Sequence, residues 1–323
     1  MDFVGSPKLI TTCIQALTGR QRADVMEIGF GGLLNLKIGD CGKVSRSVYP
    51  FLLERYENMV LNIEPGLKFE ATSSLFYEVL ALPTKDRKVY GGKGLICKGI
   101  KVKAVDEGIK KQKQLMEVWR PLLSISPGKY FASGQSFMSA ISGLKEGGDL
   151  FKNFFILFTM CLFLAPYSDK SILLDILCAV EQVHNLAHFD WCAYVASHLN
   201  QSVHRIKNKA GLPVKSKPKC GGCFLALMIG YFHRVHQGPE LSTKVPYIMH
   251  WDDESLRERI KMEVSSKSRG CLKLPRTPPE LSSEEEAAMP AKQQDTIVSQ
   301  IKVICPRLKY YFPDIGIMSQ TSK

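Results

Sequence analysis

Three segments decide the fold: FKNFFILFTMCLFLAP at residues 151–166, DWCAYVASHLNQSVHRIK at residues 190–207 and CFLALMIGYFHRV at residues 223–235. The first and the third are apolar on nearly every side, which is typical of helices in the middle of a core. Helices of this kind can bury one another's apolar surface. The block therefore predicts a helical core built from these three segments.

The first segment is long enough for a helix and too short for a membrane span. Its run from Phe154 to Ala165 is broken only by Thr159. A helix that crosses a bilayer needs about 20 apolar residues. We therefore expect a buried helix, and no membrane among the partners.

The middle segment has the pattern of an amphipathic helix. Asp190 is a good N-cap, because its carboxylate can accept hydrogen bonds from the unpaired N–H groups of the first turn. Apolar residues recur behind it at three- and four-residue spacing, beginning at Trp191. Lys207 and Lys209 fall in the last turn, where positive charge suits the helix dipole. The segment predicts a helix that buries Trp191.

Composition and length describe a globular protein. The chain has 323 residues, of which 45% are hydrophobic and 23% charged, enough for one large or two modest domains. The opening MDFVGSPKL has no basic segment before an apolar run, so it does not have the pattern of a signal peptide. We therefore interpret the ten cysteines as reduced thiols of an intracellular protein that is not secreted.

The remaining segments extend this fold class. Residues 59–71 alternate between apolar and polar side chains on either side of Pro65-Gly66, which predicts a two-stranded hairpin. The predicted class is mostly α, a multi-helix globular domain with one small antiparallel β-hairpin. Further helices are expected at about residues 7–18, 20–28, 44–56, 73–82, 107–119, 134–145 and 252–264.

The composition changes after residue 264. Residues 265–323 are rich in serine, proline and charge and close with a segment of helical pattern, so we expect a linker and a C-terminal helix there. Residues 1–264 are expected to form the helical domain, with residues 84–113 as a basic insert that is largely an exposed connection. The sequence thus predicts one folded domain and one extended segment.

A glycine cluster, GFGGLLNLKI, occupies residues 29–38. A dinucleotide-binding loop leaves a strand and enters a helix. Here a helical pattern precedes the glycines, so we expect a helix C-terminus and a tight chain reversal instead.

Two basic segments are the candidate binding surface. Residues 84–113 hold ten Lys and Arg against three Asp and Glu, a net charge of +7 in a chain of +12, and residues 205–219 hold six basic residues and no acid. Such clusters can neutralise several phosphates of a nucleic acid, whereas the alternative is a pair of solvated loops that only aid solubility. The candidate nucleic-acid-binding residues are Lys85, Arg87, Lys88, Lys93, Lys98, Lys101, Lys103, Arg205, Lys207, Lys209, Lys215, Lys217 and Lys219.

Four residues offer the ligands of a zinc site. Cys220, Cys223, His233 and His236 supply two thiols and two imidazoles, enough for tetrahedral zinc. The nine residues between the second thiol and the first histidine must also form an apolar helix, and the spacing departs from the zinc-finger pattern. We therefore expect no metal, with the cysteines at a helix start and the histidines on the surface.

Two further clusters have structural interpretations. The acids of His250-Trp-Asp252-Asp253-Glu254 are expected to cap a helix rather than hold a divalent ion, because acids are common at helix starts. His184 and His188 stand four residues apart in a helix-like stretch and could share a metal, but without a third ligand such a pair is usually structural or solvated.

The order of these motifs resembles a known family. GFGGLLNLKI, SSLFYEVLALP, FKNFFILFTMCLFLAP, FDWCAYVASHLNQSVHRIK, KCGGCFLALMIGYFHRV and VPYIMHWDDESLRERI, spread over about residues 6–264, are similar to the aminotransferase-like plant mobile domain family. That family occurs in plant transposable-element proteins and their domesticated relatives, some of which continue into a SUMO-protease-type cysteine peptidase. The label "aminotransferase-like" suggests pyridoxal phosphate, but the sequence has no recognisable lysine and phosphate-binding cup for it. We therefore expect no cofactor.

The resemblance and the charge pattern together imply a function. We expect a non-enzymatic interaction domain of a transposon-derived plant protein, located in the nucleus or otherwise in the cytoplasm. Its expected partners are DNA or RNA and nuclear or chromatin proteins. The alternative is an enzyme fragment, namely the front part of a transposon-encoded cysteine peptidase or another hydrolase whose catalytic half is missing.

Overall fold

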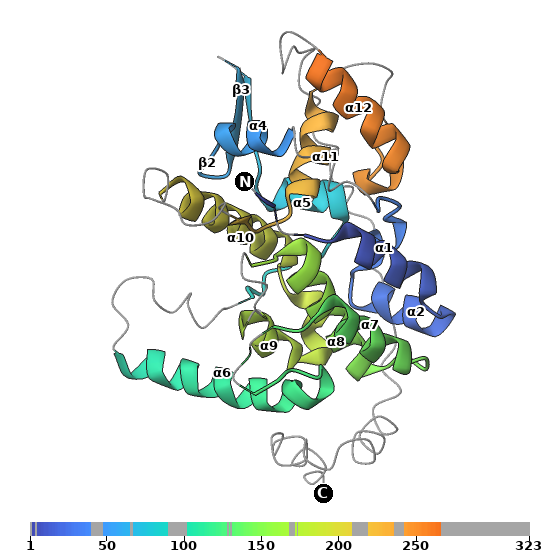
Figure 1. Ribbon diagram of the computed structural model, residues 1–323, viewed down its shortest axis with the longest axis vertical. Helices are drawn as coiled ribbons and strands as arrows, with labels where there is room; N and C mark the ends of the chain where they lie inside the picture. The colour runs from blue at the N-terminus through green and yellow to red at the C-terminus, as the bar shows by residue number, and fades with distance from the viewer. Residues whose placement is uncertain are drawn as a thin grey trace, which may run out of the picture. The chain divides into compact units, whose positions relative to one another are not determined.

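The computed structural model shows a mostly helical chain with a small antiparallel sheet, as predicted (Figure 1). The described residues belong to one compact unit, residues 1–277. The structure describes residues 2–3, 5–39, 48–64, 67–89, 102–127, 129, 131–167, 172, 174–208, 219–235 and 242–265. The expected C-terminal helix lies outside these residues.

Most of the expected helices form close to their predicted bounds. The α-helices are α1 (Pro7–Ala16), α2 (Gly19–Glu27), α4 (Val48–Arg55), α5 (Ser73–Leu80), α6 (Val102–Leu122), α7 (Gly134–Gly143), α8 (Asp149–Thr159), α9 (Leu174–Val180), α10 (Trp191–Lys207), α11 (Phe224–Arg234) and α12 (Asp253–Ser265). Shorter turns are the 3-10 helices η1 (Gly31–Asn35), η5 (Val183–His188) and η6 (Tyr247–His250) and the π-helix η4 (Met160–Leu164). Because α6 begins at Val102, the end of the basic insert is helical rather than a connection.

The predicted hairpin is part of a three-stranded sheet. Strands β3 (Val60–Glu64) and β4 (Leu67–Glu70) pair antiparallel, and β2 (Tyr56–Glu57) adds a third strand directly after α4. A separate parallel pair joins β1 (Asp2–Phe3) to β5 (Lys219–Cys220). Strands of two residues are too short to show alternation in a sequence, so neither β2 nor the parallel pair was predicted.

Helix α5, rather than the three-helix block alone, is the centre of the core. Both α10 and α11 make their most extensive helix contacts with α5, so the expectation that the three apolar segments mainly bury one another was wrong (Figure 1). Phe76 and Leu80 of α5 are fully buried. Gly230 of α11 permits this approach, because a Cβ there would lie 2.7 Å from Leu75 Cδ1.

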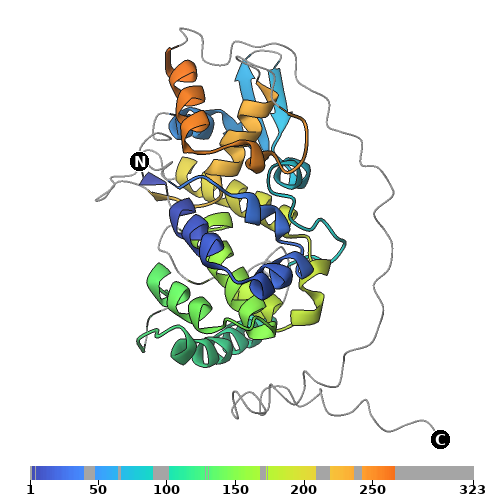
Figure 2. The ribbon, with the colours of Figure 1, turned by 90° about the vertical axis from the view of Figure 1, so that its right-hand side faces the viewer.

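Helix α8 has a different set of neighbours. It packs against α2, α7 and α9, and Figure 2 shows α2 in dark blue beside the green α8. At its end Thr159 donates hydrogen bonds from Oγ1 to Phe155 O (2.9 Å) and Ile156 O (3.2 Å), and the Ala165 N–H reaches Met160 O over five residues. Local bonding of this kind accompanies the widened π-turn of η4. Among the described residues, no helix has both the length and the apolar character needed to cross a membrane.

The glycine cluster ends α2, as predicted. Gly29 has φ +78°, and its N–H donates to Met26 O (2.9 Å) while the Phe30 N–H donates to Val25 O (3.0 Å). These two bonds form a Schellman motif, which closes a helix with a left-handed residue. A helix precedes the loop, so a dinucleotide-binding turn does not form here.

Helix α12 is fixed to α11 by a buried polar network. The Tyr231 hydroxyl and Arg259 both donate to the carboxylate of Glu263, the latter at 2.7 Å. Arg259 also donates to Val235 O (3.1 Å), at the end of α11. These contacts join α12 to the same core as the preceding helices.

Candidate nucleic-acid interface

Helix α10 is firmly held at its first turn. Asp190 Oδ1 accepts a hydrogen bond from the Ala193 N–H (2.9 Å), which confirms the predicted N-cap. Trp191 is fully buried, and its indole N–H donates to Leu186 O (2.7 Å). Its ring makes edge contacts with Phe30 and Phe189, each at 5.6 Å between centroids.

The start of the first basic segment lies against this end of α10. Lys85, Arg87 and Lys88 are exposed. The Asp190 N–H donates to Arg87 O (2.7 Å), and the Arg87 guanidinium lies 5.0 Å from the centre of the Phe189 ring and donates to Gln182. Residues 84–88 therefore have a defined position at the start of α10.

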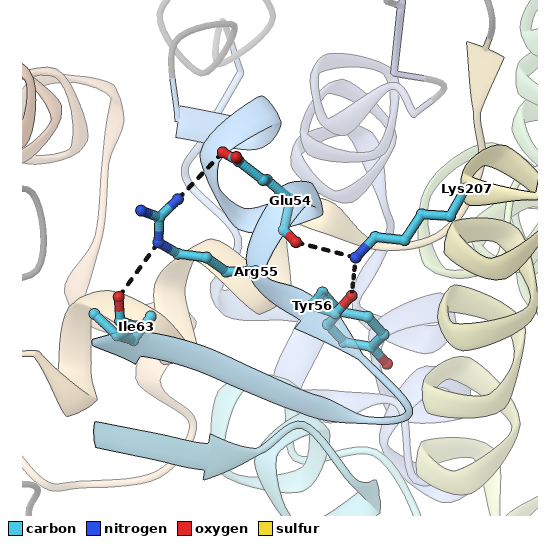
Figure 3. Close-up of polar contacts among 5 residues, drawn as sticks. All are labelled: Glu54, Arg55, Tyr56, Ile63 and Lys207. Atoms are coloured by element: carbon cyan, nitrogen blue, oxygen red, sulfur yellow. Dashed lines mark hydrogen bonds and ion pairs between the residues drawn. The ribbon is translucent and has the colours of Figure 1, made fainter. Parts of the chain in front are cut away.

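The second basic segment begins at the other end of α10. Lys207 donates two hydrogen bonds from Nζ, to Glu54 O (3.0 Å) and Tyr56 O (2.8 Å), and so satisfies carbonyls where α4 passes into β2 (Figure 3). On the far side of the same turn, Arg55 Nε donates to Ile63 O (3.3 Å). Because the last carbonyls of a helix lack partners within it, they need donors such as these. Lys207 thus has a structural role that its place in a basic run did not reveal.

Arg205 and Lys219 remain on the surface nearby. Both are exposed. The Arg205 guanidinium lies 5.2 Å from the centre of the Tyr167 ring, and its Nε donates to Gln201 O (3.2 Å). The charge of Arg205 also acts on the buried Cys220 thiol, which directly follows Lys219. The second group of described cations is therefore gathered around the end of α10.

The described exposed cations of the two basic segments lie at opposite ends of α10. Helix α10 has 17 residues, so its ends lie about 25 Å apart at 1.5 Å per residue. Lys103 lies in the first turn of α6. The other candidates lie outside the described residues: Lys93, Lys98, Lys101, Lys209, Lys215 and Lys217.

The zinc candidates that the structure describes do not converge. Cys223 precedes α11 and His233 lies near its end, so they are about 15 Å apart along the helix. His233 accepts a hydrogen bond at Nε2 from the Trp251 indole (2.9 Å) and stacks on Tyr247. His236 lies outside the described residues, among which no group of three or more potential ligands could hold a metal ion.

The acid cluster caps α12, as expected. Asp252 Oδ1 accepts hydrogen bonds from the N–H groups of Ser255 (2.9 Å) and Glu254 (3.1 Å). Hydrogen bonds from Ser255, the main cause, hold the pKa of Asp252 below its ordinary value. Asp253 Oδ1 accepts from the Gly39 N–H (3.0 Å) and ties the helix start to the loop after η1.

The exposed pair His184 and His188 lies in a 3-10 helix. With three residues per turn, positions four apart are about 120° apart around the axis. The two imidazoles therefore do not lie on one face of this helix.

Three of the described cysteines lack the character of activated nucleophiles. Burial raises the pKa of the Cys13 and Cys220 thiols to about 12 and also raises the pKa of Cys192. A nucleophilic cysteine needs the opposite shift, because the thiolate is the reactive form. These three thiols therefore do not support a cysteine peptidase site.

One buried group was not recognised from the sequence. His198 on α10 is 4% exposed, and neither ring nitrogen has a hydrogen-bond partner among the described residues. Burial, with a smaller contribution from the Arg205 charge, lowers the pKa of His198 to about 3. The sequence showed only a histidine in an apolar stripe, which does not indicate how its nitrogens are satisfied.

Comparison with known proteins assigns a family to the chain. The family model described as Domain of unknown function (DUF8566) matches residues 5–228, about two thirds of the chain. No curated protein and no solved structure matches the chain. The resemblance to the plant mobile domain family was therefore wrong, and the transposon, nuclear and peptidase expectations lose that basis. The match ends within α11, whereas the buried network of Tyr231, Arg259 and Glu263 continues the folded unit into α12.

Proposed function

We propose that this chain, which belongs to the family described as Domain of unknown function (DUF8566), binds nucleic acid by electrostatic contact with phosphate groups. The observation that carries the proposal is the charge distribution around α10. Residues 191–239 contain no Asp or Glu, and seven Lys and Arg. Exposed cations lie at both ends of α10 in the folded chain.

The physical basis is the release of counterions. Each phosphate that a Lys or Arg neutralises frees condensed cations into solution, and this gives affinity without reading the base sequence. The exposed side chains of α10 are Gln201, His204, Arg205 and Lys207, and none of them carries a negative charge that would repel a phosphate backbone. The alternative is that the positive charge of these segments only aids solubility, and a measurement of DNA binding separates the two.

The test is a titration of duplex DNA of arbitrary sequence, followed by fluorescence anisotropy. We expect binding in about the micromolar range at low salt, with log affinity falling linearly as log salt rises. Replacing Lys98, Lys101 and Lys103 by glutamine should flatten the salt slope by about one unit for each phosphate that the variant no longer neutralises.

A matched variant separates local contacts from net charge. Lys8→Gln, Lys145→Gln and Lys244→Gln remove the same charge from exposed positions outside both basic segments. This triple variant should keep the wild-type slope to within about one unit. If the chain does not bind DNA at low salt, or if the two triple variants change the salt slope equally, the basic segments serve only solubility.

A further inference from the structure

We infer that α10 separates two phosphate-contacting sites that engage one DNA duplex together. This inference deepens the proposed function and rests on it. The first site comprises the exposed Lys85, Arg87 and Lys88, and the second comprises Arg205 and Lys219. The inference follows from how each group is fixed to its end of the helix.

The two sites have a fixed separation because each one contacts an end of α10. Backbone contacts join Thr84 to Asp190 and Arg87 to Phe189, so the first site cannot move independently of the helix start. Beside the second site, Lys207 bonds to the turn after α4 while Gly222 packs closely on Leu199 of α10. The helix therefore acts as a rigid spacer of about 25 Å.

Each site alone is expected to bind weakly. Asp86 lies within the first site, and the exposed Glu54 and Glu57 lie near the second, on the turn that Lys207 caps. These carboxylates offset part of the positive charge. Strong binding then requires both sites at once, because a second contact on the same duplex is intramolecular and gains from a high effective concentration.

This arrangement sets a minimum duplex length. With base pairs spaced about 3.4 Å apart along the duplex, a separation of about 25 Å corresponds to about 7 or 8 base pairs. A shorter duplex reaches one site at a time, whereas a longer one reaches both. Affinity should therefore rise in a step with length, and not only through the larger number of binding positions.

The experiment uses the full chain and DNA hairpins with stems of 6, 12 and 18 base pairs at low salt. Each affinity is divided by the number of positions that the stem offers. We expect a rise of about tenfold or more from 6 to 12 base pairs and almost none from 12 to 18. Lys85→Gln with Lys88→Gln should remove the step, and so should Arg205→Gln with Lys219→Gln.

Controls keep the outcomes distinct. Lys8→Gln with Lys145→Gln should retain the step, and Lys219→Gln alone tests the second site without disturbing the contact of Arg205 with Tyr167. Salt-dependent binding without a step, or a step that survives removal of either site, overturns the two-site inference and leaves the proposed function standing. Absence of binding to every hairpin overturns both.

Discussion

Removing the Trp191 side chain should destabilise the fold more than any surface change. The ring is fully buried between Phe30 and Phe189, and its N–H is the donor to Leu186 O. Loss of a buried Trp ring typically costs about 3 to 5 kcal/mol, a range that includes the cavity left behind. The unpaired carbonyl at Leu186 adds about 1 kcal/mol, so Trp191→Ala should lie at the upper end of that range.

Urea denaturation followed by far-ultraviolet circular dichroism measures this destabilisation. The denaturation midpoint should fall while the slope of free energy against urea stays unchanged. Trp191→Phe should fall between the wild type and Trp191→Ala, because it keeps most of the ring volume but loses the hydrogen bond to Leu186 O. Phe131→Ala, at a position that is 49% exposed, should change the free energy of unfolding by less than about 1 kcal/mol. A wild-type midpoint in Trp191→Ala would refute the account of how α10 is anchored.

Three further substitutions test other contacts. In the folded chain the pKa of His198 is lowered from 6.5 to about 3, so as the pH falls the imidazole is protonated in the unfolded chain first. The free energy of unfolding should therefore decline from pH 6.5 toward pH 3, by up to about 1.4 kcal/mol per pH unit. Unfolding curves across this range should lose that contribution in His198→Phe and keep it in His204→Gln. Lys207→Met should cost about 1 to 2 kcal/mol in urea denaturation, because two carbonyls lose a charged donor, whereas Lys219→Met should cost little. Gly32→Ala places a Cβ 1.9 Å from Leu80 O and should lower the melting temperature, with a cost of about 1 to 3 kcal/mol, whereas Gly143→Ala meets nothing within 4 Å and should not. Equal melting temperatures for the two alanine variants would contradict the close approach of η1 to α5.

The parts of the fold that local chemistry determines were predictable. Asp190 caps α10 because its carboxylate lies next to free N–H groups, and Gly29 ends α2 because it can adopt a positive φ. Such signals need only neighbouring residues. Helix positions were therefore predicted within a few residues over most of the described chain.

Packing partners were not predictable in the same way. The pattern of α5 shows an apolar helix, but it does not show that α5 packs against both α10 and α11, or that Gly230 of α11 allows one of these approaches. In the sequence, Lys207 is likewise one charge in a basic run. In the structure its Nζ donates to the carbonyls of Glu54 and Tyr56, which are far away in the sequence. Contacts between residues far apart in sequence leave no mark in local periodicity.

The family resemblance failed for a related reason. It depended on runs of apolar residues with short punctuation such as Leu82-Pro83 and Asp190-Trp191. In the structure these residues serve packing and capping, since Leu82 is fully buried and the Trp191 N–H donates to Pro83 O (3.0 Å). Many helical folds need such features, so they carry little information about a particular family.

The salt dependence of DNA binding by the wild-type chain tests the central claim most directly. The affinity for one 20-base-pair duplex should be measured by anisotropy at several salt concentrations from about 50 to 200 mM. The proposed function predicts a straight line of log affinity against log salt, with a slope of about −0.9 for each phosphate contacted and hence a magnitude of several units. A flat line, or no binding at the lowest salt, would contradict it.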